Sequence, residues 1–141
     1  MKFNRLVYLL FALVIGLMVW IVKDSFTQPS VRDLDLVYKE LVFFRNENNT
    51  GPIQRVYVVY VEDDSRELLE AYGDYMPHTK YGNTQVYFFT DSTNAPKDVL
   101  HSKPFIPIAY QAYCVAKYEK SAMGDVRFLN RPFAEKNEID Q

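Results

Sequence analysis

An uninterrupted apolar run from Leu6 to Val22 constrains this chain more than any other feature of its sequence, and it contains no charged side chain. A helix satisfies its own backbone hydrogen bonds, so such a segment is more stable in hydrocarbon than in water. At about 1.5 Å per residue the run spans roughly 25 Å, slightly less than a bilayer core of about 30 Å. We therefore predict a single-pass transmembrane signal anchor over residues 1–23.

The charges that flank the run predict its orientation. Lys2 and Arg5 precede it without any acidic residue, whereas Lys23 behind it is followed at once by Asp24. Basic flanks of membrane helices stay in the cytoplasm. We therefore expect a cell-membrane protein with a cytoplasmic N-terminus. The rest of the chain then lies outside, in the periplasm or the extracellular space.

A cleaved signal peptide is the main alternative for the same run. Cleavage requires small residues behind the apolar region. Here the run ends in bulky residues, Trp20 to Val22, followed by two charged ones. The sequence therefore favours an uncleaved anchor.

Composition limits the classes of partner for the part behind the run. The chain has a net charge of −2, and Lys2 and Arg5 supply two positive charges ahead of the run, so the remainder carries −4. This balance argues against nucleic acid, which binds to basic surfaces.

Cys114 is the only cysteine, which excludes an intramolecular disulfide and a two-cysteine redox site. Asn48-Asn49-Thr50 is an N-glycosylation sequon, meaningful only in a host with a secretory pathway.

Hydrophobic periodicity and turn residues predict an α+β domain over residues 31–132, between a short tether at 24–30 and a flexible tail at 133–141. The predicted elements are a helix over 30–45, a strand over 55–61, a helix over 65–76, a strand over 84–90, a long strand over 105–120, a turn over 121–124 and a strand over 125–130.

The order of these elements predicts the topology. Two strands that enclose a helix favour a parallel, right-handed β-α-β unit. The last two strands flank a turn with Gly124 where a positive φ is needed, which favours an antiparallel hairpin. Together they predict a mixed four-stranded sheet with two helices.

The connection between the second predicted helix and the following strand is the first candidate site. It gathers aromatic, cationic and hydrogen-bonding side chains in a short span, which could form a ligand or partner surface. The same composition also suits an ordinary turn-rich connection. The candidate residues are Tyr75, His78, Lys80, Tyr81 and Asn83.

Acidic residues at two strand ends are the second candidate site. Glu62, Asp63 and Asp64 follow the first of the two parallel strands, and Asp91 follows the second. If the strands are parallel, these carboxylates share one edge of the sheet and could hold a divalent cation such as Ca²⁺ or Mg²⁺. Helix capping and turn formation explain the same residues without a ligand.

The sequence shows no complete catalytic motif, and no cofactor is predicted. Cys114 lies inside a predicted strand, which suits a packed thiol better than an activated one.

The leading hypothesis is a non-enzymatic, membrane-anchored module that binds a protein partner. One alternative is a small cation-binding domain or enzyme that uses the strand-end acids. Another is a small subunit of a membrane complex assembled through the anchor, where Ala12 and Gly16 have a small-xxx-small spacing.

Overall fold

A computed structural model describes residues 4–27, 29–47 and 51–134 of the chain. Internal contacts divide the chain into two units, residues 1–33 and 34–141. The first unit contains the helix α1 (Arg5–Phe26) and the short 3-10 helix η1 (Val31–Asp33). The second unit contains β1 (Tyr38–Arg45), β2 (Gln54–Val61), α2 (Arg66–Tyr75), β3 (Asn83–Phe89), α3 (Ile108–Gln111), β4 (Cys114–Lys120) and β5 (Val126–Asn130).

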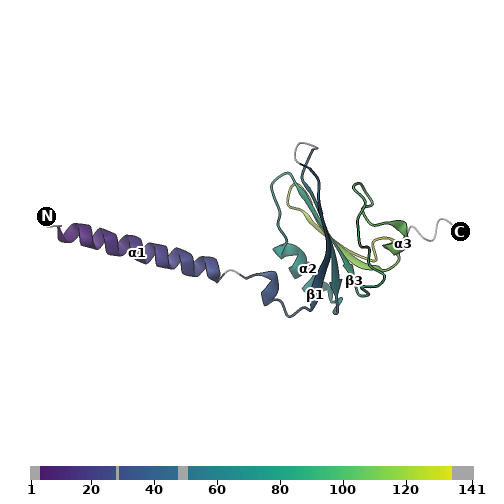
Figure 1. The fold of residues 1–141 in the computed structure, drawn as a ribbon, viewed down its shortest axis with the longest axis horizontal. Helices are drawn as coiled ribbons and strands as arrows, with labels where there is room; N and C mark the ends of the chain where they lie inside the picture. Colours follow the sequence, from purple (N-terminus) through teal and green to yellow (C-terminus); the bar gives the residue numbers. More distant parts are fainter. Residues whose placement is uncertain (1–3, 28, 48–50, 135–141) are drawn as a thin grey trace. The chain divides into compact units, whose positions relative to one another are not determined.

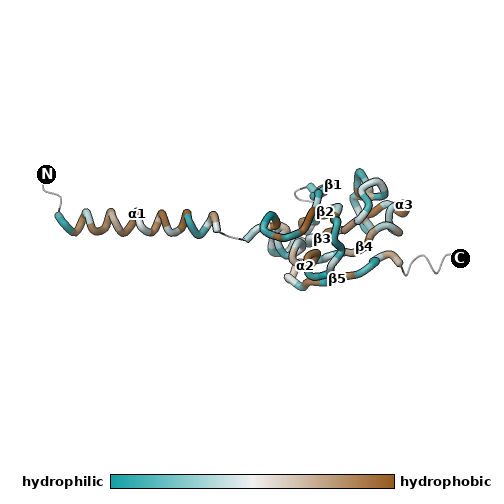
Figure 2. The backbone as a smooth tube through the Cα atoms, turned by 90° about the horizontal axis from the view of Figure 1, so that it is seen from below, coloured by the Kyte–Doolittle hydropathy of each residue, from teal (hydrophilic) through white to brown (hydrophobic). Residues whose placement is uncertain are grey.

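The helix α1 contains the apolar run and extends beyond it. It has 22 residues, none of them buried, and apolar residues follow one another along most of its length (Figure 2). By length and composition this helix can cross a membrane. Because α1 ends at Phe26, the helix takes in the first half of the predicted tether at 24–30.

The second unit confirms the mixed α+β fold and its predicted parallel unit. The sheet has the order β1-β2-β3-β4-β5, and β2 pairs with β3 in parallel through the α2 crossover. The pairs β1–β2, β3–β4 and β4–β5 are antiparallel. The last pair is the predicted hairpin, and Gly124 in its turn has φ +89°. Among the residues that the structure describes, the sheet has five strands rather than the predicted four.

The fifth strand is β1, where the sequence predicted a helix over 30–45. Leu41 and Phe44 are three residues apart, a spacing typical of a helix. In the structure the pairing with β2 shifts register between Glu40 and Val42. Such a bulge inserts an extra residue and breaks the period of two that identifies a strand. Pairing with β2 therefore prevails over a local pattern that was misleading.

The predicted long strand over 105–120 is also shorter than expected. Residues Ile108–Gln111 form α3 behind Pro107, and β4 begins only at Cys114. Proline fits the start of a helix because it lacks the amide hydrogen that the first turn leaves unbonded.

The ordered domain also continues past Pro132. Phe133, which the sequence placed in the tail, is buried and its ring stacks on Tyr87.

Two covers bury the opposite faces of the sheet. The helix α2 covers one face, and the segment 90–113 with α3 covers the other (Figure 1). Tyr72 of α2 contacts the ring of Phe88, whereas the next residue, Phe89, packs in the cluster with Val99 and Ile106. Side chains alternate along a strand, so a strand with both faces covered is apolar throughout. This explains the unbroken apolar runs at residues 56–61 of β2 and 86–89 of β3.

Gly73 sets the distance between α2 and the sheet. A Cβ atom at this position would lie 2.3 Å from the ring of Tyr118. Helix propensity alone predicts that Gly73→Ala stabilises the domain by about 1 kcal/mol. We expect the clash to dominate and to lower the free energy of unfolding by about 2 kcal/mol, as overpacked cores do. Urea unfolding of the full chain in detergent measures this.

The matched control is Gly16→Ala in α1, where a Cβ atom meets nothing within 4 Å. This control should leave the unfolding of the sheet domain unchanged. A Gly73→Ala variant as stable as the parent chain would show that α2 does not pack this closely on Tyr118.

Candidate functional site

The display loop, residues 75–83, joins α2 to β3 and contains the first set of predicted site residues. Backbone hydrogen bonds hold it against its neighbours. The Tyr81 amide donates to the Ala122 carbonyl (3.3 Å), and the Asn83 amide donates to the Ile53 carbonyl (2.7 Å). The display loop therefore lies beside the β4–β5 turn and the start of β2, at the end of the sheet where β3 begins.

The predicted residues of the display loop separate into exposed and inward ones. Tyr81 is 69% exposed, and the Lys80 ammonium lies 5.1 Å from the centre of its ring. Tyr75 is also exposed at the end of α2. Asn83 is the first residue of β3 and is half-buried. The outward surface of the loop is formed mainly by the aromatic and cationic groups of the other predicted residues.

His78 faces the sheet. Its Nδ1 atom lies 3.2 Å from Thr84 Oγ1, and that hydroxyl donates to the Pro77 carbonyl at 3.0 Å. A hydroxyl has one hydrogen to donate, so Nδ1–H is the donor to Thr84. Burial, with help from the nearby charges of Lys120 and Arg55, lowers the pKa of His78 below its ordinary 6.5. The imidazole is therefore neutral at neutral pH.

The acidic end of the sheet is formed by Glu62, Asp63, Asp64 and Asp91. Because β2 and β3 are parallel, the structure places all four beyond the same end of the sheet, as the sequence predicted. All four side chains are exposed.

Two of these carboxylates have local partners. Asp63 accepts from the Ser65 amide at 2.8 Å. Asp91 accepts from the amide and hydroxyl of Thr93 and from Asn94 Nδ2, and these hydrogen bonds lower its pKa. Within residues 4–27, 29–47 and 51–134, no three His, Cys, Asp or Glu side chains are grouped so as to hold a metal ion. A cation at the acidic end thus stays a prediction.

Cys114 is a packed thiol, as its place in a strand predicted. It is buried at the start of β4, where its Sγ atom lies 3.3 Å from the Ala116 carbonyl. Burial raises the pKa of this thiol to about 12. The thiol is protonated at neutral pH, which does not suit a nucleophile.

A cavity that the sequence did not indicate lies on the face of the sheet covered by segment 90–113. We call it the amide cavity, after Gln85; its volume is about 340 Å³. Two neighbouring strands supply its floor, with Gln85 and Tyr87 from β3 and Lys117 from β4. It is lined by Gln85, Tyr87, Lys103, Pro104, Lys117, Leu129, Pro132 and Phe133.

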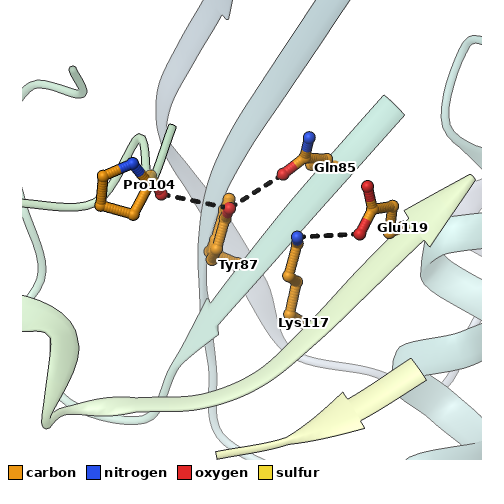
Figure 3. Close-up of polar contacts among 5 residues, drawn as sticks. All are labelled: Gln85, Tyr87, Pro104, Lys117 and Glu119. Atoms are coloured by element: carbon orange, nitrogen blue, oxygen red, sulfur yellow. Dashed lines mark hydrogen bonds and ion pairs between the residues drawn. The ribbon is translucent and has the colours of Figure 1, made fainter. Parts of the chain in front are cut away.

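Polar contacts fix the side chains of the amide cavity (Figure 3). Tyr87 donates its hydroxyl hydrogen to Gln85 Oε1 at 2.9 Å, with the Pro104 carbonyl 3.4 Å away. Lys117 Nζ lies 2.9 Å from Glu119 and 5.4 Å from the centre of the Tyr87 ring. Burial raises the pKa of Tyr87, so the phenol stays protonated and remains a donor.

The Gln85 amide is only partly satisfied. This side chain is 1% exposed, and its Nε2 atom has no hydrogen-bond partner among the residues that the structure describes. An unpaired buried amide costs about 1–3 kcal/mol of stability. Gln85 follows Asn83 and Thr84 at the polar start of β3, so nothing in the sequence distinguished it as a site residue.

Comparisons of the chain with protein-family models, with curated proteins and with solved structures found no match.

The lowered pKa of His78 predicts a loss of stability in acid. A group whose pKa is lower in the folded state stabilises the fold above its unfolded pKa, and this contribution disappears as the pH falls through the folded value. We expect the melting temperature to begin to fall as the pH drops below about 6.5, the ordinary pKa of histidine in the unfolded chain, and to fall less in His78→Gln. An imidazole signal that vanishes in His78→Gln should titrate below 6.5 in proton NMR spectra. Titration above 6.5 would contradict the described environment.

Proposed function

We propose that this chain is a single-pass membrane protein that displays a small α+β domain outside the cytoplasm, where the domain binds a protein partner. The observation that carries the proposal is α1, a helix of 22 residues without a buried side chain that contains the apolar run 6–22. Such a helix spans about 33 Å, enough for a bilayer core of about 30 Å. Exposing an apolar surface of this size to water is unfavourable, whereas the hydrocarbon of a bilayer can surround it without that cost.

The orientation is proposed from charge. Lys2 and Arg5 lie ahead of the apolar residues, and all 18 acidic residues lie behind them. A basic N-terminal flank favours retention of that side in the cytoplasm. The sheet domain would then be exported, and Asn48-Asn49-Thr50 would be exported with it.

The display loop supports the proposed binding role. Backbone hydrogen bonds join the loop to Ala122 and Ile53. These bonds fix the positions of its exposed side chains relative to the sheet. Met123, next to Ala122 in the β4–β5 turn, is 91% exposed. Tyr81 and this methionine therefore offer apolar surface at one end of the domain, and tyrosine is enriched where proteins meet.

The sequon provides a natural reporter of orientation. Translated into microsomes, the full chain should gain one glycan at Asn48, remain in the membrane after alkaline extraction and retain its N-terminal residues. Thr50→Ala should lose the glycan. The variant Ile139→Thr, which creates a second sequon at Asn137, should add another glycan to the parent chain. A chain glycosylated at neither position would contradict the proposed orientation, and release by alkali would contradict the anchor.

A photo-crosslinking residue can test the display loop as a partner surface. Placed at Tyr81 in the full chain in its native membrane, it should give one discrete crosslinked product. The matched control is Tyr113, which is 47% exposed and precedes β4 at the opposite end of the sheet. Equal products at both positions would indicate random collision, and the absence of product at Tyr81 would count against the display loop as the partner surface.

A further inference from the structure

Three cations form a row across the sheet next to the display loop. Arg45 of β1 pairs directly with Arg55 of β2. Arg55 is next to Thr84 of β3, and Thr84 is opposite Lys120 of β4. Directly paired residues project from the same face of a sheet, and Thr84 shares its face with Phe88, which contacts α2. We call Arg45, Arg55 and Lys120, which lie on this face, the cationic row.

The cationic row forms no ion pair within the part of the chain that the structure describes. The two ion pairs found there join other residues of α2 and of β4. Arg45 and Arg55 are instead directly opposite each other, and like charges in such a cross-strand pair are destabilising. The row therefore lowers the stability of the domain unless an anion joins it.

Arg55 is buried but not sealed. Its side chain is 9% exposed, and its Nη1 atom donates to Thr79 Oγ1 of the display loop at 2.9 Å. The Nε and Nη2 atoms have no partner among the described residues. Both retain contact with solvent, because the unpaired side-chain atoms without solvent contact in this part of the chain are Gln54 Oε1 and Gln85 Nε2. Arginine is rarely buried without a partner, so these two donors need an explanation.

The free edge of the Arg55 guanidinium has the geometry of an oxyanion site. Nε–H and Nη2–H lie side by side on one edge and can donate in parallel to the two oxygens of a carboxylate. The surroundings are also positive. The charges of Lys120 and Arg55 help to lower the pKa of His78, and Lys80 adds an exposed ammonium group in the display loop. A positive potential of this kind attracts anions.

We propose that the cationic row binds a carboxylate side chain in an acidic segment of the partner that the display loop contacts. This inference rests on the proposed function and names the chemistry of its partner. The free edge of Arg55 holds one carboxylate, while Arg45 and Lys120 attract its neighbours. Phe43, two residues before Arg45 on the same face, is 54% exposed. An exposed ring beside the charges favours a peptide over an inorganic anion.

Calorimetry on the full chain in nonionic detergent tests the proposal with the end-blocked peptide Glu-Thr-Glu-Thr-Glu. We expect saturable binding, about tenfold tighter than that of Gln-Thr-Gln-Thr-Gln and weaker as the salt concentration rises. Inorganic phosphate should bind less tightly than the acidic peptide, because one anion reaches fewer of the cations. The absence of saturable heat, equal affinity for both peptides, or tighter binding of phosphate would overturn the proposal.

Substitution of Arg55 locates the site. Arg55→Gln should weaken binding of the acidic peptide about tenfold, and Arg55→Lys should restore only part of the affinity, because lysine keeps the charge but lacks the two-pronged edge. The matched control is Arg127→Gln. Arg127 is exposed on β5 and pairs with Glu119, the neighbour of Lys120 in β4, so it lies on the opposite face of the sheet. An equal loss in both glutamine variants would indicate nonspecific attraction and would overturn the proposal.

Arg45→Glu keeps the test valid if Arg55→Gln fails to fold. It places a carboxylate of the chain itself directly opposite Arg55, where the structure has a second cation. We expect the melting temperature to rise by about 4 °C, because a like-charge pair becomes an opposite-charge pair. Binding of the acidic peptide should be lost, because the site is then occupied. Either a lower melting temperature or an unchanged peptide affinity would overturn the proposal.

Crosslinking separates this inference from the proposed function. The photo-crosslinking residue at Tyr81 should give less product in the Arg55→Gln chain than in the parent chain. A product that persists unchanged would leave the display loop as the partner surface and would overturn the acidic partner. The absence of any product in the parent chain, together with tight binding of the acidic peptide, would contradict the proposed function and still support the cationic row as a carboxylate site.

Discussion

The parallel pairing of β2 with β3 is the constraint on which the rest of the domain depends. Both strands are buried on both faces, so each face needs its own cover. The crossover helix α2 provides one cover, since a parallel connection must return across the sheet. The other cover is the segment 90–113, which packs Val99, Phe105 and Ile106 against the strands. A domain of this size thus builds a core of three layers from few residues.

The elements around that pair were predictable because their signals are local. Residues 56–61 of β2 and 86–89 of β3 are all β-branched or aromatic, α2 has an apolar stripe that ends near Pro77, and Gly124 marks the hairpin turn. The strand β1 was not predictable, because its bulge between Glu40 and Val42 replaces the period of two with a spacing like that of a helix. Long-range pairing with β2 decides this segment, and no short window of sequence contains that partner.

The candidate site residues were predictable to different degrees. The position of the display loop follows from the helix before it and the strand after it, and the grouping of the acidic end follows from parallel strands. The amide cavity needed the structure, since it joins Gln85 on β3, Lys117 on β4 and Lys103 from segment 90–113. Only the register of β3 with β4, which places Tyr87 opposite Lys117, brings these groups onto one face.

The bulge in β1 has a further consequence under the proposal that α1 anchors the chain in a membrane. The strand β1 is an edge of the sheet, and it is rich in aromatic and aliphatic residues. A flat edge of this kind invites pairing with the same edge of another copy. Under that proposal, copies confined to two dimensions would meet more often than freely diffusing domains. The irregular register between Glu40 and Val42 disrupts the regular row of backbone N–H and C=O groups that a second copy would need for pairing. The same bulge that made this strand look helical in the sequence therefore also disfavours pairing of its edge with another copy.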